Sequence, residues 1–187
     1  MGNAEKQTKQ KIMEIAKEHF SRYGYAERFE AMEGSGGDSR TVVLFEKELY
    51  AAVIEQEKIR VVDQYKQIFE QPCSIYEKLE KDILYCSSSQ SLLRQIGVGG
   101  QGEPEIPMQD YSQKVYQIKE EALKRAVDKG ELRTDAKIEE MLQFLYIFVY
   151  GMTELRKTEN SELVLKQRTL MQDAQMFVEI FSVRYGV

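Results

Sequence analysis

The spacing of apolar residues along the chain is typical of helices almost throughout. Residues 12–20 repeat apolar side chains at intervals of three and one, which places them on one side of a helix. Residues 47–70 contain no glycine or proline and carry an apolar face, so they predict a long helix. No strand pattern and no internal repeat is present, and the predicted fold class is all-α. Further helices are expected to end near residue 96 and to cover residues 108–129, 135–157 and 161–185.

Residues that favour helix ends divide this pattern into elements. Thr8 is the predicted N-cap of the first helix. The segment Ser74-Ile75-Tyr76-Glu77 has the form of a capping box, in which the serine and glutamate satisfy amides at a helix start. Gly130 is a predicted C-cap. Thr134 and Asp135 are predicted to cap the helix that follows.

The clearest predicted loop covers residues 97–107, which contain four glycines and two prolines. Within it, residues 97–102 match the pattern G-x-G-x-x-G. A dinucleotide-binding site places this pattern between a strand and a helix, whereas here a helical pattern precedes it and Glu103-Pro104-Glu105 follows. No cofactor is therefore predicted.

Residues 144–150, Phe-Leu-Tyr-Ile-Phe-Val-Tyr, are apolar on every side of their predicted helix. Such a helix must be covered all round, by its own domain and by a second subunit. The stretch is much shorter than the roughly 20 residues that cross a bilayer, and no signal-peptide pattern opens the chain. We expect a soluble, cytoplasmic protein without a membrane partner.

Composition narrows the function classes. The 187 residues carry a formal net charge of −5, which argues against sequence-wide attraction to nucleic acid. Two cysteines without C-x-x-C spacing and a single histidine form no recognisable metal or disulfide framework. That histidine, His19, lies on the apolar side of the first helix and is expected to pack rather than react. No enzyme, no catalytic residue and no metal site is predicted.

Three segments resemble one protein family. Residues 11–25, Lys-Ile-Met-Glu-Ile-Ala-Lys-Glu-His-Phe-Ser-Arg-Tyr-Gly-Tyr, resemble the first helix of the tetracycline-repressor (TetR) family of bacterial transcription regulators. Residues 47–53 resemble the start of that family's long connecting helix, and residues 129–135 the turn before its penultimate helix. The resemblance implies an N-terminal three-helix helix-turn-helix domain over residues 1–47. It implies a C-terminal helical ligand-binding and dimerisation domain over residues 48–187.

The resemblance places the DNA-reading helix within residues 39–45. By alignment, the interval 26–46 is about five residues shorter than is usual, so either the helix-turn-helix is trimmed or residues are absent from the chain as given. Residues 1–47 hold as many acidic as basic side chains, so no strongly basic footprint is present. The implied DNA-binding residues are Ser39, Arg40, Thr41 and Lys47. Ser39 could instead be only an N-cap, and Lys47 an ordinary surface lysine.

The larger part of the chain is expected to hold a small lipophilic effector, or a cationic one attracted to tyrosine rings. The candidate pocket combines aromatic and sulfur-bearing side chains, which equally suit a plain core. The residues are Tyr85, Cys86, Tyr111, Tyr116, Met141, Phe144, Phe148 and Met152. By resemblance, the helices over 135–157 and 161–185 pair with their copies in a four-helix bundle.

The expected function is therefore a ligand-responsive transcriptional regulator that binds a palindromic double-stranded DNA operator as a homodimer. One alternative is a helical small-molecule-binding dimer that has lost sequence-specific DNA binding. Another is a purely structural helical adaptor.

Overall fold

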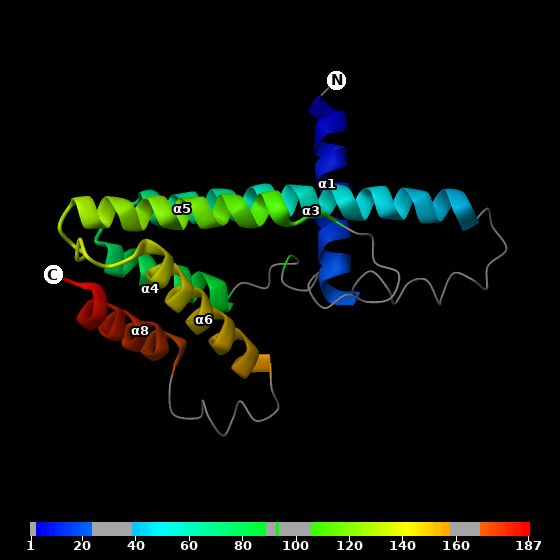
Figure 1. Cartoon of the computed structure of the whole chain (residues 1–187). Helices are drawn as coiled ribbons and strands as arrows, with labels where there is room; N and C mark the ends of the chain where they lie inside the picture. Colours follow the sequence, from blue (N-terminus) through cyan, green and yellow to red (C-terminus); the bar gives the residue numbers. More distant parts are fainter. Residues whose placement is uncertain (1–2, 24–38, 89–92, 94–105, 158–168) are drawn as a thin grey trace. The chain divides into compact units, whose positions relative to one another are not determined.

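The computed structural model describes residues 3–23, 39–88, 93, 106–157 and 169–187 (Figure 1). Within these residues the chain is all-helical, apart from turns and a single isolated β-bridge. None of the described helices combines the length and apolar character that crossing a lipid bilayer requires. The helices are α1 (Asn3–Tyr23), α3 (Ser39–Glu70), α4 (Ile75–Ser88), α5 (Gln109–Asp128), α6 (Ile138–Lys157) and α8 (Leu170–Tyr185).

The chain divides into two compact units, which are described separately. Unit 1 consists of Met1–Val61 and Gln90–Gln109, and unit 2 of Val62–Ser89 and Asp110–Val187. Unit 1 thus extends beyond the predicted N-terminal domain of residues 1–47. The boundary between the units at residues 61 and 62 lies inside α3.

In unit 1, α1 packs against α3 through part of its predicted apolar side. Ala16 and Phe20 are buried, and the Phe20 ring meets the Tyr50 ring edge-on at a centroid distance of 4.9 Å. Ile12 and Ile15, on the same predicted side, are exposed. Thr8 lies inside α1 rather than at its start, because the helix begins at Asn3. The predicted helix is confirmed, but the prediction of Thr8 as its N-cap was wrong.

Helix α3 runs without a break from Ser39 to Glu70. The sequence predicted two elements here, a recognition helix over residues 39–45 and a connecting helix from Lys47. The structure joins them, because no glycine or proline separates residue 45 from residue 47. The glycine-rich segment 33–38 lies outside the described residues.

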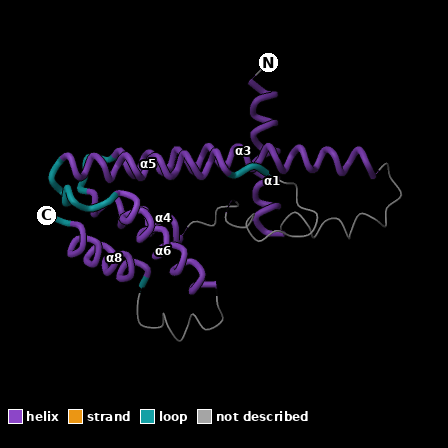
Figure 2. Tube along the Cα trace, viewed as in Figure 1, coloured by secondary structure: helices purple, strands orange, loops and turns teal. Residues whose placement is uncertain are grey.

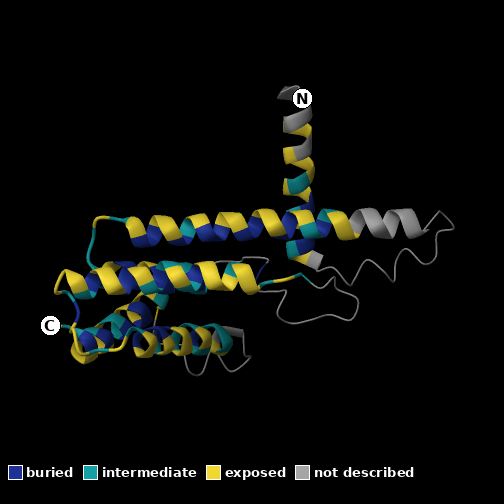
Figure 3. Ribbon diagram, turned by 45° about the horizontal axis from the view of Figure 1, so that its top comes forward, coloured by how far each residue is buried: buried dark blue, intermediate teal, exposed yellow. Residues whose placement is uncertain are grey.

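In unit 2, α4 packs against α6 and α8 (Figure 2). Aromatic rings fill the contact between α6 and α8: the Phe177 centroid lies 5.1 Å from that of Phe144 and 4.7 Å from that of Phe148. Phe177 and Phe181 are fully buried. Figure 3 shows buried and exposed positions alternating along the helices, as amphipathic helices require.

The first turn of α4 confirms the predicted capping box. The Ser74 backbone amide donates to Glu77 Oε2 at 3.0 Å, and the Glu77 amide donates to Ser74 Oγ at 3.3 Å. The next amide, of Ile75, donates to the Glu131 carboxylate at 2.6 Å. The turn that follows α5 therefore holds the start of α4.

Gly130 ends α5 as predicted. Its φ is +73°, a left-handed conformation that favours glycine, and its amide donates to the Val127 carbonyl at 3.0 Å. Gly186, at the end of α8, is needed for a different reason. A Cβ there would lie 2.7 Å from the Tyr76 hydroxyl oxygen, which is too close for a larger side chain.

Two other predicted boundaries differ. Helix α6 begins at Ile138, and Asp135 instead accepts hydrogen bonds from Arg133 in the preceding turn, so the predicted cap at residues 134–135 was wrong. Helix α8 begins at Leu170 behind a capping box formed by Thr169 and Gln172. Residues 161–168, predicted to be helical, and the predicted loop residues 97–105 lie outside the described residues.

Candidate functional site

The predicted DNA-binding residues lie at the beginning of α3. Ser39, Arg40 and Thr41 form its first turn, and Lys47 follows on the same helix with an exposed side chain. The side chains of residues 39–46 lie outside what the structure describes. A helix start carries partial positive charge from its free amides, which suits contact with phosphate groups.

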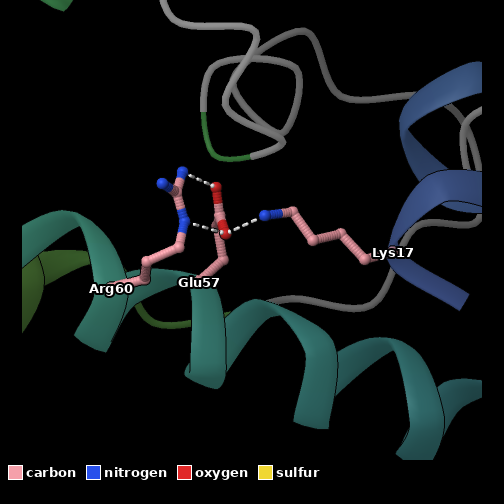
Figure 4. A network of polar contacts seen from close by, with 3 residues as sticks. All are labelled: Lys17, Glu57 and Arg60. Carbon is pink, nitrogen blue, oxygen red and sulfur yellow. Dashed lines mark hydrogen bonds and ion pairs between the residues drawn. The ribbon is translucent and has the colours of Figure 1, made fainter. Parts of the chain in front are cut away.

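Further along α3, the buried carboxylate of Glu57 joins α1 to α3 (Figure 4). Glu57 Oε2 lies 2.7 Å from Lys17 Nζ on α1 and accepts a hydrogen bond from Arg60 Nε at 2.8 Å. Arg60 Nη2 donates to the other oxygen at 2.6 Å, which makes the contact bidentate. Burial alone would raise the pKa of the Glu57 carboxyl, but the hydrogen bonds from Arg60 and Lys17 lower it to about 2.

We expect acid to weaken this contact between α1 and α3. The pKa of Glu57 is lowered from 4.5, so its contribution to stability is present above that pH and is lost as the pH falls toward 2. Because Lys17 and Arg60 are partly exposed, solvent screening reduces the contribution to about 1–2 kcal/mol. Urea unfolding of the wild type and of Glu57→Gln as a function of pH measures it: the variant should be less stable at neutral pH, and the difference should vanish in acid.

Glu18→Gln is the matched control for that measurement. Glu18 lies on α1 and pairs with Arg22, and both side chains are well exposed. Its substitution should change little. A difference between Glu57→Gln and the wild type that stays constant down to the pKa of Glu57 would contradict the assignment.

Unit 2 contains a polar cluster formed by four buried residues, Tyr65, Asp82, Cys86 and Lys119, and by the exposed Tyr146. Asp82 is 0% exposed and Lys119 is 2% exposed, and Lys119 Nζ donates to Asp82 Oδ2 at 2.7 Å. The same ammonium lies 4.8 Å from the ring centroid of Tyr65 and 5.1 Å from that of Tyr146. A carboxylate and two ring faces therefore surround one cation.

The cluster extends on the other side of Asp82. Cys86 Sγ donates to Asp82 Oδ1 at 3.4 Å, and the Tyr65 hydroxyl lies 3.0 Å from the same sulfur. Because a thiol has one proton, the Tyr65 hydroxyl then donates to the sulfur. Both oxygens of the buried carboxylate are thus hydrogen-bonded, as a buried charge requires.

The electrostatics keep the Lys119 ammonium charged. Burial alone would lower the pKa of Lys119, but the negative charge of Asp82 raises it above its ordinary value. Burial raises the pKa of Tyr65, and Cys86 and Asp82 raise it further. The tyrosine therefore stays neutral beside the Lys119 ammonium, which keeps its charge.

The predicted effector residues fall into two groups. Cys86 belongs to the polar cluster; the Tyr85 ring meets Tyr65 edge-on at 5.5 Å, and the Tyr116 ring stacks on Tyr146 at 6.4 Å. Tyr111, on α5, lies near enough to Tyr65 to influence its pKa. The second group has the burial of ordinary packing residues: Phe144 and Phe148 contact α8, and Met141 and Met152 are buried.

Sequence reasoning missed Asp82, Lys119 and Glu57. A signal was available for Lys119, because it lies on the apolar side of α5, four residues after Val115 and three before Ala122. Asp82 likewise lies between Leu79 and Cys86 at helical spacing. A charged residue on an apolar helix side predicts a buried ion pair, although not its partner.

A concave surface lies where α4 begins. An open groove there is lined by residues 72–74, 76–77, 129–131 and 187. Glu77 caps α4 and Glu131 binds the Ile75 amide, so both carboxylates serve the fold. Among the described residues, no three His, Cys, Asp or Glu side chains are placed to hold a metal ion.

Comparison with known protein families, curated proteins and solved structures finds no match for this chain.

Proposed function

We propose that this protein is a homodimeric, ligand-responsive transcription regulator of the TetR type. The observation that carries the proposal is the contact between two of the segments that bear the resemblance. Phe20 of the segment 11–25 packs against Tyr50 of the segment 47–53, so both belong to one packed helical unit. Such packing is what a DNA-reading domain built on a connecting helix requires.

The beginning of α3 is the proposed DNA-contacting element. Residues 39–41 form its first turn, where side chains and free amides meet base edges and phosphates when a helix end enters the major groove. The Lys17–Glu57–Arg60 contact holds α1 against the same helix. A fixed α1 would keep the reading element at one angle to the groove.

The remaining helices are the proposed sensor and dimerisation part. The cluster around Lys119 and the tyrosines beside it supply polar tips within an apolar surrounding, the composition typical of small-molecule sites. Ile147 and Tyr150 on α6 and Ile180 and Val183 on α8 are exposed apolar side chains. A second copy of the chain would cover them and place two reading elements on a palindrome.

DNA binding tests the proposal directly. Fluorescence anisotropy with duplexes from the DNA flanking the protein's own gene should give selective binding that weakens as salt is raised. If Arg40 reads a guanine, Arg40→Ala should weaken binding to the preferred duplex by about 5- to 150-fold and bring it near that of an unrelated duplex.

Lys66→Ala is the control, since Lys66 is an exposed cation farther along the same helix. It should leave the affinity unchanged. Equal weak binding to all duplexes at micromolar protein, or no salt dependence, would overturn the DNA-reading function.

The second candidate function is a helical small-molecule-binding dimer without DNA recognition. The unbroken course of α3 through residues 39–70 favours it, because a helix-turn-helix ordinarily has a turn between its reading helix and the next one. Thermal stabilisation by a ligand, with no selective DNA binding, would decide for this alternative.

A further inference from the structure

We propose that Asp82, Tyr65 and Tyr146 form a binding site for an organic ammonium ion, which Lys119 occupies in the ligand-free chain. The inference deepens the proposed function, because it names the chemical class of the effector. Unit 2 alone carries it, so it is tested without DNA.

The contacts of Lys119 define the recognition chemistry. Its ammonium lies 2.7 Å from Asp82 Oδ2 and within 5.1 Å of two tyrosine ring centroids. A carboxylate combined with aromatic ring faces is how proteins hold alkylammonium groups. The position of Lys119 therefore shows that the cluster has room for an alkylammonium group.

Access to this site lies at Tyr146. The side chain of Tyr65 is buried, but Tyr146 is 37% exposed, so one wall of the ammonium site reaches the surface of the chain. Tyr116 stacks on that wall from α5. Because Asp82 is 0% exposed, the proposed site requires the Tyr146 side chain to turn aside when an amine enters.

Replacing the Lys119 ammonium by the ammonium of a ligand leaves the net charge beside Asp82 unchanged. Asp82 is fully buried, and leaving it without a cation would be costly. An incoming amine that displaces Lys119 keeps the carboxylate neutralised and moves the lysine's charge toward water. An anion of the same size would face Asp82 unpaired, so the site selects positive charge.

Calorimetric titration with n-butylammonium chloride tests the inference, because its four-carbon chain matches the lysine side chain. The full-length protein should bind it saturably, whereas sodium chloride at equal ionic strength and sodium butyrate should not bind. Lys119→Ala removes the competing ammonium and should bind n-butylammonium at least about tenfold more tightly than the wild type.

Tyr146→Ala and Gln143→Ala form the matched pair of surface variants. Both residues lie on α6 and are exposed, but the Lys119 ammonium lies over the Tyr146 ring. Tyr146→Ala should weaken n-butylammonium binding by about three- to tenfold, and Gln143→Ala should leave it unchanged. Both variants keep Lys119, so this comparison stays decisive if Lys119→Ala does not fold.

Several results would overturn the ammonium site. They are the absence of saturable binding to the wild type, equal responses to n-butylammonium and sodium, or equal effects of Tyr146→Ala and Gln143→Ala. Amine binding without selective DNA binding would keep this inference and remove the proposed regulator function. Selective DNA binding without amine binding would remove the ammonium site and leave the proposed regulator function in place.

Discussion

Replacing Lys119 by methionine is expected to lower the free energy of unfolding by about 3–5 kcal/mol. The substitution keeps most of the side-chain volume but leaves Asp82, which is 0% exposed, without its cation. The carboxylate must then be buried uncompensated or take up a proton. Chemical unfolding followed by circular dichroism at neutral pH measures the loss.

Two companion variants make this result specific to the ion pair. Lys124→Met, on the same helix, removes an exposed lysine paired with Glu120 and should have little effect. Asp82→Asn combined with Lys119→Met removes both charges, and the double variant should regain part of the stability that the single variant loses. A Lys119→Met protein as stable as Lys124→Met would refute a buried ion pair at this position.

Replacing Ile147 by aspartate is expected to raise the dissociation constant of the proposed dimer by at least about 100-fold. Ile147 is 63% exposed on α6, three residues before the exposed Tyr150, so the two lie on one helix side. A charge introduced at the centre of an apolar contact between two copies would be buried without a partner. Sedimentation equilibrium over a range of concentrations measures the dissociation constant.

Ile59→Asp is the control for the dimer experiment. Ile59 is also 63% exposed, but it belongs to α3 in unit 1 and is not one of the residues of the proposed contact on α6 and α8. Its substitution should leave the dimer intact. A monomeric wild type, or equal loss of dimer in both variants, would count against a second copy as the partner of this surface.

The apolar stretch 144–150 shows how well helical periodicity predicts which residues are buried. Because the stretch is apolar all round, the sequence predicted that it would be fully covered. In the single chain Leu145 is buried and Tyr146, Ile147 and Tyr150 are exposed. The chain itself therefore covers one side of α6, and a second subunit would have to cover only the exposed side.

Local chemistry was predictable where both partners are close in sequence. The Ser74–Glu77 capping box and the left-handed Gly130 depend on residues a few positions apart. The Asp82–Lys119 pair joins two helices 37 positions apart, and nothing in local spacing selects one acidic residue as the partner of this lysine. Long-range polar contacts of this kind follow from tertiary packing, which periodicity does not specify.

The position of the boundary between the two units bears on how the protein can be dissected. Residues 61 and 62 are consecutive members of α3, in a stretch that contains no glycine or proline. Cutting the chain there would expose up to four backbone amides on one fragment and four carbonyls on the other, all of which are bonded in the intact helix. A truncated form that isolates either unit therefore has to keep additional turns of α3 or replace them with a designed cap.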